Sequence, residues 1–445
     1  MEEYKYYINI FNELINSMLS LAKINEKYAN KQNYFEFLKS NDNDNLSDKE
    51  IVELIIHLKI QLSREAQSNN DNEEINETTE NIKNKILESK KGKFFYENIH
   101  NNNGKISSNH YYIRLLIHYC NEENSMISKE IESNRKNQVK NIISVFESLM
   151  SNLLAQIYRN EYNYEKLNDE KILYKDIAHL TSVNDIHEFV IEQKVISILY
   201  ENINKWLAEF VNNFTKTTNQ KFKRKYSKFI DIVNEIYERR NIITHNNGVI
   251  NHLYMKRVNE NMIEDSFCIG KEIEITENYI QESINNTLNL GIILFLHACE
   301  KLGYHNKLPF INNITSIGLK LLNSGYYNCG LTLFYEIDRI LKDNSELLDI
   351  NKYNIFISKL LLNNQNVKNE IKAFFDNKQE LSKQDIMAKA IFLNENDYLC
   401  KIDNFIKCFT YYEIVNIFEW PIFKLLENDV EYIEYKKNYL YTEDV

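Results

Sequence analysis

The residues of this chain best suited to chemistry are Arg240 and His245, which have four residues between them. A histidine titrates near neutral pH and can take up or release a proton, and an arginine presents a planar fork of donors to phosphate oxygens. Cleavage of RNA without a metal needs a base for the 2′-hydroxyl proton, an acid for the departing 5′-oxygen and a cation for the charged phosphorane between them. On an unbroken helix the two side chains would lie about 140° apart, which the long arginine side chain can bridge. Because the chain has ten histidines, the spacing alone is weak and the neighbouring residues decide its meaning.

The segment around this pair is strongly basic. Residues 216–257 contain ten lysines and arginines and three acidic residues, so this segment carries +7 of a net charge of −11 and the rest of the chain carries −18. Such a concentration of positive charge could hold a phosphate backbone. The candidate RNA-binding residues before the pair are Lys223, Arg224, Lys225 and Lys228. The alternative is a solvated, lysine-rich helix that precedes a turn.

Three polar neighbours of the pair are further candidates. Asn241 could hydrogen-bond a phosphate oxygen, orient the imidazole of His245, or cap a local turn. Arg239 is either a second phosphate ligand or the ion-pair partner of Glu235, which stands four residues earlier in the favourable acid-before-base order. Asn246 flanks the histidine closely enough to set its tautomer and contact substrate, or it makes ordinary hydrogen bonds at the end of a helix.

The sequence ERRNIITHNNG, in which Arg240 precedes the polar Asn241 and His245 leads into an Asn-Asn-Gly turn, resembles the catalytic motif of the HEPN superfamily. The resemblance covers roughly residues 126–305 and implies a helical bundle in which a long helix precedes the motif helix. It also implies a metal-independent ribonuclease. HEPN ribonucleases are usually dimers, and one histidine cannot easily occupy both sides of the phosphorus. We therefore expect a homodimer that brings two copies of Arg240 and His245 into one cleft.

The composition favours an all-α fold of two or three domains. The 445 residues include only 9 glycines and 2 prolines, too few for the turns of an all-β protein or for a dinucleotide-binding fingerprint. The six cysteines form no CxxC pair, which suits a reducing cytoplasm and predicts no metal site and no cofactor. The N-terminus has the pattern of an amphipathic helix rather than of a signal peptide or a membrane span, so we expect a cytoplasmic protein without membrane contact.

Apolar periodicity predicts the helices that must position the motif. A helix is expected after a Ser47 cap. Long apolar stripes predict further helices over 139–157, 186–214, 229–240 and about 277–301. The only β-structure expected is a small hairpin near 267–276, where a glycine stands between short alternating stretches.

We expect three regions along the chain. These are an N-terminal helical region (1–125) with a polar linker near 67–80, a HEPN-like helical domain (126–305) and a C-terminal helical region (306–445). The last region begins with a helical hairpin whose turn is expected at 323–327. The positions where tetratricopeptide hairpins place small residues and aromatics are occupied here by Gly318, Gly325, Tyr327, Gly330 and Phe334, so this segment resembles one such repeat.

The leading hypothesis is a metal-independent endoribonuclease that leaves a 2′,3′-cyclic phosphate and a 5′-hydroxyl. By analogy with the superfamily, we expect it to act in microbial antiphage defence, abortive infection or a toxin system, with RNA as substrate and a regulatory protein or phage-derived trigger as a partner. The alternative is a catalytically silent HEPN adaptor or scaffold that binds RNA, nucleotide or protein. A third interpretation is a helical-repeat scaffold in which the motif is accidental.

Overall fold

The structure is a computed structural model that describes residues 3–32, 47–65, 83–102, 105–159, 167, 170–215, 218–304, 307–341, 345–364 and 366–441. These residues are mostly helical, and their β-structure is limited to one two-stranded sheet and one isolated bridge. The predicted all-α class is confirmed. None of the helices in these ranges combines the length and apolarity that a membrane span requires. The polar linker predicted at 67–80 lies outside the described residues.

The chain divides into two compact units, residues 24–137 and residues 1–23 together with 138–445. The predicted boundaries at 125 and 305 are therefore not the boundaries of the compact units. The smaller unit ends within the long helix α6 (Tyr111–Arg159), which the boundary predicted at residue 126 would divide. The region after residue 305 is not separate, because its apolar side chains share one core with the helices that precede it.

The smaller unit has a core of its own. It contains α3 (Asp48–Glu65), α5 (Lys90–Asn98), β1 (His100–Asn102), β2 (Lys105–Ser107) and the first part of α6. The predicted cap of α3 is confirmed, because Ser47 Oγ donates to the Glu50 carboxylate (2.6 Å) and accepts from the Glu50 backbone N–H (3.4 Å). Strands β1 and β2 pair antiparallel. Ile55, Phe95 and Ile113 are among the buried residues that hold these elements together.

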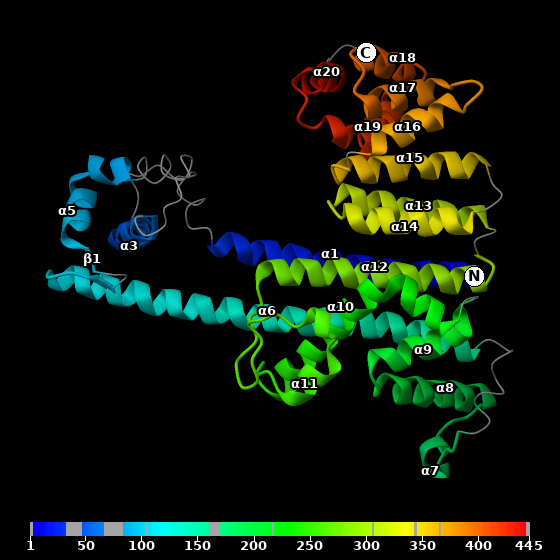
Figure 1. Ribbon diagram of the computed structural model, residues 1–445, viewed down its shortest axis with the longest axis horizontal. Coiled ribbons are helices and arrows are strands. Elements are labelled where there is room, and N and C mark those ends of the chain that lie inside the picture. The colour runs from blue at the N-terminus through cyan, green and yellow to red at the C-terminus, as the bar shows by residue number, and fades with distance from the viewer. Residues whose placement is uncertain are drawn as a thin grey trace. The chain divides into compact units, whose positions relative to one another are not determined.

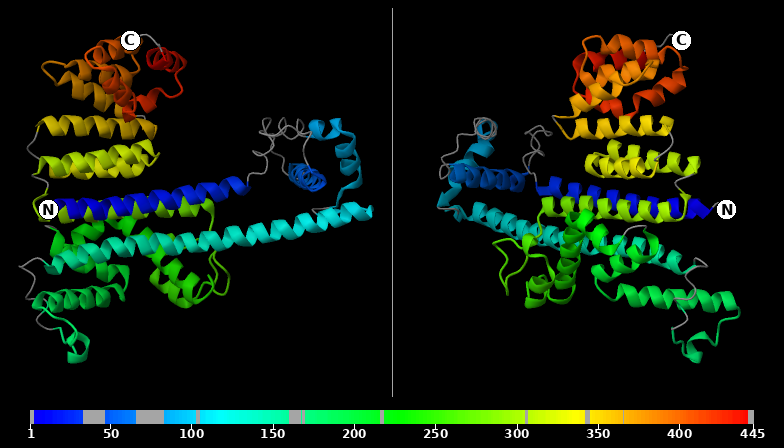
Figure 2. Two further views of the ribbon diagram at one scale, coloured as in Figure 1. Left: turned by 180° about the vertical axis from the view of Figure 1, so that it is seen from behind. Right: turned by 45° about the vertical axis from the view of Figure 1, so that its right-hand side comes forward.

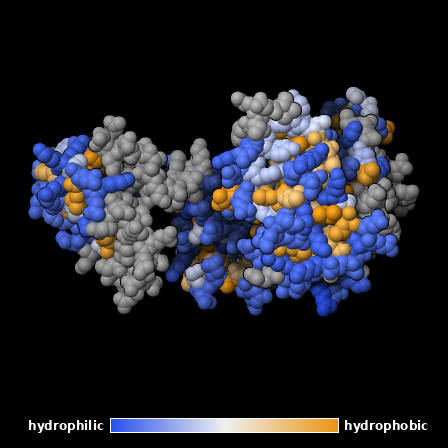
Figure 3. Space-filling view, turned by 90° about the horizontal axis from the view of Figure 1, so that it is seen from above, coloured by the Kyte–Doolittle hydropathy of each residue, from blue (hydrophilic) through white to orange (hydrophobic). Residues whose placement is uncertain are grey.

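The helices of the larger unit lie in stacked layers (Figure 1; Figure 2). They are the first part of α1 (Glu3–Gln32), up to residue 23, the last part of α6, α7 (Tyr174–Ile177), α8 (Val183–Leu199), α9 (Ile203–Phe214), α10 (Asn219–His245), α11 (His252–Arg257), η3 (Glu260–Met262), α12 (Glu277–Lys301), α13 (Leu308–Asn323), α14 (Tyr327–Ile340), α15 (Ser345–Leu361), α16 (Val367–Asp376), α17 (Lys383–Leu393), α18 (Tyr398–Ile406), α19 (Tyr411–Phe418), η5 (Pro421–Leu426) and α20 (Val430–Tyr441). Helix α12 separates the layer of α9 and α10 from the layer of α13 and α14 (Figure 1). Seen from above, apolar side chains interrupt a mainly hydrophilic surface at the end of the unit that carries α16–α20 (Figure 3).

Helix α12 is the most enclosed element of the larger unit, and its predicted bounds are confirmed. Every residue from 287 to 299 is buried. Gly291 allows α1 to approach closely, because a Cβ at this position would lie only 2.7 Å from Leu14 Cδ2. The ring of Phe295 stacks on the ring of Phe11 with centroids 4.2 Å apart. The first helix of the chain therefore packs on a helix that follows it by more than 250 residues.

The predicted helical hairpin after Pro309 is confirmed as α13 and α14. Its turn contains Gly325, whose φ of +82° is a conformation that favours glycine. A Cβ on Gly318 would lie 2.5 Å from Phe334 Cζ, so the absence of a side chain there allows the two helices to approach. Both positions are among those that carry the tetratricopeptide-like pattern.

One predicted helix is divided in two. The apolar pattern over 186–214 predicts a single helix, but the structure breaks it between Leu199 and Ile203 into α8 and α9. Asn202 begins the second helix, since its side chain accepts a hydrogen bond from the Lys205 backbone N–H at 3.2 Å. Apolar spacing continues across this break, which is why periodicity alone did not reveal it.

The predicted β-hairpin at 267–276 is wrong. This segment does not pair with itself but with the loop that follows α10: Ile250 N–H donates to the Lys271 carbonyl and Ile273 N–H donates to the Gly248 carbonyl, both at 2.9 Å. An isolated bridge joins Val249 to Glu272. The alternating pattern indicated extended backbone but not the correct pairing, because the partner segment lies 21–25 residues earlier.

A buried polar cluster joins α10, α12 and α14. Tyr226, at a non-helical position within α10 (φ −113°, ψ 18°), donates to Glu336 Oε1 at 2.8 Å and lies 3.1 Å from His297 Nε2. Glu336 also pairs with Arg339 at 2.6 Å, and Arg339 pairs with Glu300. Burial, and then the positive charge of Arg339, lowers the pKa of His297 to about 4. The imidazole is therefore neutral in the folded chain at neutral pH.

This pKa predicts a pH dependence of stability. The folded chain protonates His297 only below about pH 4, whereas the unfolded chain protonates it near pH 6.5. The stability is therefore fully present above pH 6.5 and is lost as the pH falls toward 4. In urea titrations we expect this loss to reach up to about 3 kcal/mol, and we expect His297→Gln to remove most of it. The exposed His252→Gln variant is the control and should behave like the unchanged chain; the same pH dependence in His297→Gln would contradict the assignment.

Candidate active site at the end of α10

The motif lies on the last turns of α10 and the turn that follows. The helix begins after Thr218, whose side chain accepts from the Lys221 N–H, and its last residue is His245. The carbonyl of Ile242 accepts the N–H groups of Asn246 (2.8 Å) and Gly248 (2.9 Å), which closes the end of the helix. Asn247 (φ +50°) and Gly248 (φ +83°) turn the chain away. The predicted helix and the Asn-Asn-Gly turn are both present.

A pocket of about 360 Å³ lies between this end of α10 and helix α11. Its lining includes Asn241, His245 and Asn246, three of the residues predicted for the site. The side chain of His245 is exposed at this place. Asn246 is also held in position, because its amide donates to the Val249 carbonyl at 2.7 Å. The pocket thus combines an accessible imidazole with two side-chain amides.

Two charged residues of this pocket were not predicted as site residues. Glu238 and Arg257 line it, and their charged groups lie 3.5 Å apart. Asn241 Nδ2 donates to the same carboxylate at 3.4 Å. The side chain of Glu238 is 4% exposed, whereas that of Arg257 is 47% exposed and reaches solvent. Glu238, Asn241 and His245 follow an i, i+3, i+7 spacing, which places them on one helix face and was the available sequence signal.

Arg240 lies on another side of the helix from this pocket. Its guanidinium pairs with Glu147 of α6, donates to Asn241 Oδ1 at 3.1 Å, and lies 4.9 Å from the centre of the Tyr237 ring. Burial raises the pKa of Glu147, and the positive charge of Arg240 opposes this shift. Arg240 is not among the described residues that line the pocket. Arg240 therefore contacts a residue of the pocket, Asn241, without lining the pocket itself.

Arg239 is a structural residue in this chain, which corrects its prediction as a phosphate ligand. It is 3% exposed, and its Nε donates to Glu235 Oε1 at 2.7 Å. Its Nη1 donates to the Glu274 carbonyl at 2.9 Å, and its guanidinium lies 3.8 Å from the centre of the Tyr279 ring. Of the two predicted roles, the ion pair with Glu235 is the one that forms. A buried guanidinium engaged in this way cannot reach a substrate.

The Glu235 carboxylate also holds Tyr254, a residue that lines the pocket. Glu235 accepts hydrogen bonds from the hydroxyl groups of Tyr254 (2.5 Å) and Tyr279 (2.8 Å). Burial, and then the charge of Glu235, raises the pKa of Tyr254 well above its ordinary value, so this hydroxyl stays protonated and donates. Tyr254 belongs to α11 and lines the pocket. The buried cluster therefore positions α11 against α10.

The basic run lies at the other end of α10. Arg224 and Lys228 are exposed, Lys223 donates to Asn204 Oδ1 at 3.3 Å, and Lys225 lies 3.6 Å from the Glu336 carboxylate. Lys228 precedes His245 by 17 residues, which corresponds to about 25 Å along a helix. The structure therefore does not bring Lys223, Arg224, Lys225 and Lys228 together with the motif.

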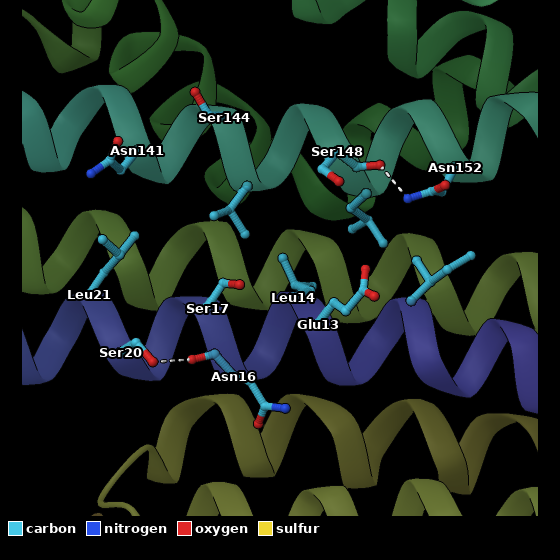
Figure 4. A pocket seen from close by; sticks show the side chains of 13 residues that line it. Glu13, Leu14, Asn16, Ser17, Ser20, Leu21, Asn141, Ser144, Ser148 and Asn152 are labelled. Atoms are coloured by element: carbon cyan, nitrogen blue, oxygen red, sulfur yellow. Dashed lines mark hydrogen bonds between the residues drawn. The ribbon is translucent and has the colours of Figure 1, made fainter. Parts of the chain in front are cut away.

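A second hollow in the larger unit has a greater volume than the pocket at the end of α10. A groove of about 620 Å³ runs between α1 and α6, lined by serine, asparagine and apolar side chains (Figure 4). Two of its polar side chains are used within their own helices: Ser20 Oγ donates to the Asn16 carbonyl at 2.8 Å and Asn152 donates to the Ser148 carbonyl at 3.0 Å. The Asn16 side chain instead accepts from Lys320 of α13. No acid–base pair is formed by the residues that line it. Across the described ranges, no group of three or more histidine, cysteine or acidic side chains is arranged to hold a metal ion.

The chain matches no protein-family model, no curated protein and no solved structure. Its function must therefore be inferred from its own residues and their geometry.

The buried Arg239 cluster predicts a large effect of one substitution. Glu235→Ala leaves the Arg239 guanidinium buried without its carboxylate, which costs about 3–5 kcal/mol in comparable cases. We expect a loss of this size in the free energy of unfolding measured in urea. The control is Glu192→Ala on α8, where the side chain is exposed and we expect a change of less than about 1 kcal/mol. Equal effects of the two substitutions would mean that the cluster does not stabilise the fold.

Proposed function

We propose that the chain is a metal-independent endoribonuclease of the HEPN type. The observation that supports this most is the exposed His245 on a pocket that it shares with Asn241 and the solvent-exposed Arg257. Asn241 accepts a hydrogen bond from Arg240, so the motif arginine contacts one of the residues that line the pocket with His245. These groups are of the kinds that phosphate recognition and proton transfer require.

The proposed reaction uses the substrate as its own nucleophile. A base removes the proton from the 2′-hydroxyl, the 2′-oxygen forms a bond to phosphorus, and the bond from phosphorus to the 5′-oxygen breaks as an acid protonates that oxygen. His245 is the proton-transfer residue in this proposal. Arg240 and Asn241 stabilise the phosphorane, and Arg257, which the sequence did not predict, adds a phosphate ligand from α11. Asn246 contributes a further polar contact.

The reaction needs an acid and a base on opposite sides of the phosphorus, and each chain offers one His245. We therefore infer a homodimer in which the α10 ends of two chains share one cleft. The wider role follows the HEPN resemblance: an RNA-cleaving protein of the microbial cytoplasm in antiphage defence, abortive infection or a toxin system, held inactive by a regulatory protein until a phage-derived trigger releases it.

One observation favours the catalytically silent alternative. The charge of Arg240 is already balanced by Glu147, and the basic run lies about 25 Å from His245. A module that binds RNA, nucleotide or protein through the first half of α10 would not need the histidine. The two functions therefore differ in what the loss of His245 should do.

The assay that separates them is RNA cleavage in the presence of EDTA. We expect the unchanged chain to leave 2′,3′-cyclic phosphate and 5′-hydroxyl ends and to leave DNA intact, because DNA lacks the 2′-hydroxyl. His245→Ala should reduce cleavage at least a hundredfold while RNA affinity changes only a few-fold. The control is His252→Ala, an exposed histidine of α11 seven residues later.

Full activity of His245→Ala would contradict the assignment, as would 5′-phosphate ends or an absolute requirement for Mg²⁺. The dimer is tested on the same preparations by light scattering. Cleavage by a chain that is strictly monomeric with and without RNA would overturn the shared cleft.

The role of the basic run is tested by the salt dependence of RNA binding. Changing Lys223, Arg224, Lys225 and Lys228 together to glutamine should weaken binding and flatten the plot of log affinity against log salt. The slope should fall by about 0.7 for each phosphate of single-stranded RNA that the variant no longer neutralises. The matched control removes four exposed lysines of the smaller unit, which are Lys90, Lys91, Lys93 and Lys105. If both variants change the slope equally, the run is a solvated face and not a binding site.

A further inference from the structure

The C-terminal part of the larger unit contains a cavity that the proposed reaction does not use. It has a volume of about 300 Å³ and lies between α13, α15, α17 and η5. Leu319, Ile357, Met387 and Ala388 give it an apolar wall. The lining contains no lysine, arginine, histidine, aspartate or glutamate. A cavity of this size and character suits a small uncharged molecule.

One buried amide in this lining has no partner in the described part of the chain. Asn354 is 6% exposed and lines the cavity. The hydrogen bonds of the described residues use its backbone carbonyl, which accepts from Ser358 Oγ at 2.7 Å, but they do not use its side-chain amide. By contrast, Asn351, one turn earlier on α15, donates to the Phe334 carbonyl at 2.9 Å. The side-chain atoms of Asn354 are not among the fully buried polar atoms that lack a partner, so this amide remains accessible and can pair with a ligand or water in the cavity.

Two aromatic residues are also part of the lining. Tyr353 and Trp420 both line the cavity. The Tyr353 hydroxyl is already committed, since it bonds to Asp385, which in turn pairs with Lys378 at 2.7 Å. Its ring is engaged as well, because it stacks on Phe375 with centroids 5.9 Å apart and lies 5.4 Å from Lys378 Nζ, so Tyr353 contributes a fixed wall of the cavity. Trp420, which precedes η5, is half-buried and offers a second ring.

We propose that this cavity binds a neutral planar heterocycle of the nucleobase class. The Asn354 amide carries adjacent donor and acceptor groups, which match the paired acceptor and donor on the edge of a base. The half-buried ring of Trp420 supplies the stacking contact that a flat heterocycle uses, and Tyr353 adds an apolar wall. The uncharged lining excludes a phosphate from the interior, so any phosphate of such a ligand must lie in solvent. This site is independent of the pocket at the end of α10.

The chain provides its own reporter for the test. It has two tryptophans, and Trp206 is fully buried on α9, so a ligand in the cavity should change mainly the emission of Trp420. The full-length chain is titrated with adenosine, with cytidine, and with toluene as an apolar ring that lacks a hydrogen-bonding edge. We expect at least one nucleoside to change the emission in a saturable way and to raise the melting temperature. Trp420→Phe should remove the emission change while binding measured by calorimetry remains.

Variants of the cavity then identify the recognition group. Asn354→Ala should weaken nucleoside binding about tenfold or more, whereas Asn328→Ala, an exposed asparagine of α14, should not change it. Ala388→Leu, which fills the cavity, should abolish binding, and each variant is used only after its melting curve shows that it is folded. The absence of a saturable response to both nucleosides at millimolar concentration would overturn the proposal. Binding of toluene alone, unaffected by Asn354→Ala, would also overturn it and would indicate a socket for an apolar side chain of a partner protein.

Discussion

The buried ion pair between Arg239 and Glu235 is the interaction on which the geometry of the candidate active site depends. A guanidinium that is 3% exposed must have its donors satisfied by the protein, since burying an unpaired charge is far more costly than any single packing contact contributes. The Arg239 guanidinium donates hydrogen bonds to the Glu235 carboxylate and the Glu274 carbonyl, and it lies against the ring of Tyr279. The start of α12 is thereby fixed to α10, and Tyr254 fixes α11 to the same carboxylate. The pocket is the space that this arrangement leaves beside the end of α10.

This arrangement separates two arginines that are neighbours in the sequence. Consecutive residues of a helix point about 100° apart, so when Arg239 enters the core Arg240 is turned toward Glu147 of α6. The face that carries Glu238, Asn241 and His245 is turned toward α11. Arg239 stabilises the fold from the core, whereas the side chain of Arg240 is partly exposed. The burial of Arg239 therefore decides which motif side chains remain accessible.

Much of the fold could be predicted from local pattern. The buried stripe at 139–157 and the bounds of α12 follow from apolar spacing, and the hairpin of α13 and α14 follows from the positions of Gly318 and Phe334. The failures have a common physical cause, which is that the deciding contact is distant in sequence or not apolar. At Asn202 a single capping hydrogen bond begins a new helix although the apolar pattern continues.

The candidate site was predictable to a similar degree. The residue types and spacing singled out Asn241, His245 and Asn246, which do line one pocket. The acid-before-base order predicted the partner of Arg239 but could not reveal that the pair is buried. Glu238 was counted only as a charge, although its helical spacing places it on the face of His245. Arg257 could not be assigned to the site because the turn after α10, and not any helical spacing, brings it back to Glu238.

The stacking of Phe11 on Phe295 has a consequence for how the chain is made. These rings are 284 residues apart, and synthesis at about 5–20 residues per second separates their emergence from the ribosome by about 15–60 s. During that interval the apolar face of α1 has no α12 to cover it. The larger unit therefore cannot complete its core while it is being translated from its first residue onward. The face of the N-terminal helix that packs on α12 therefore stays uncovered until a partner encoded 284 residues later has been synthesised.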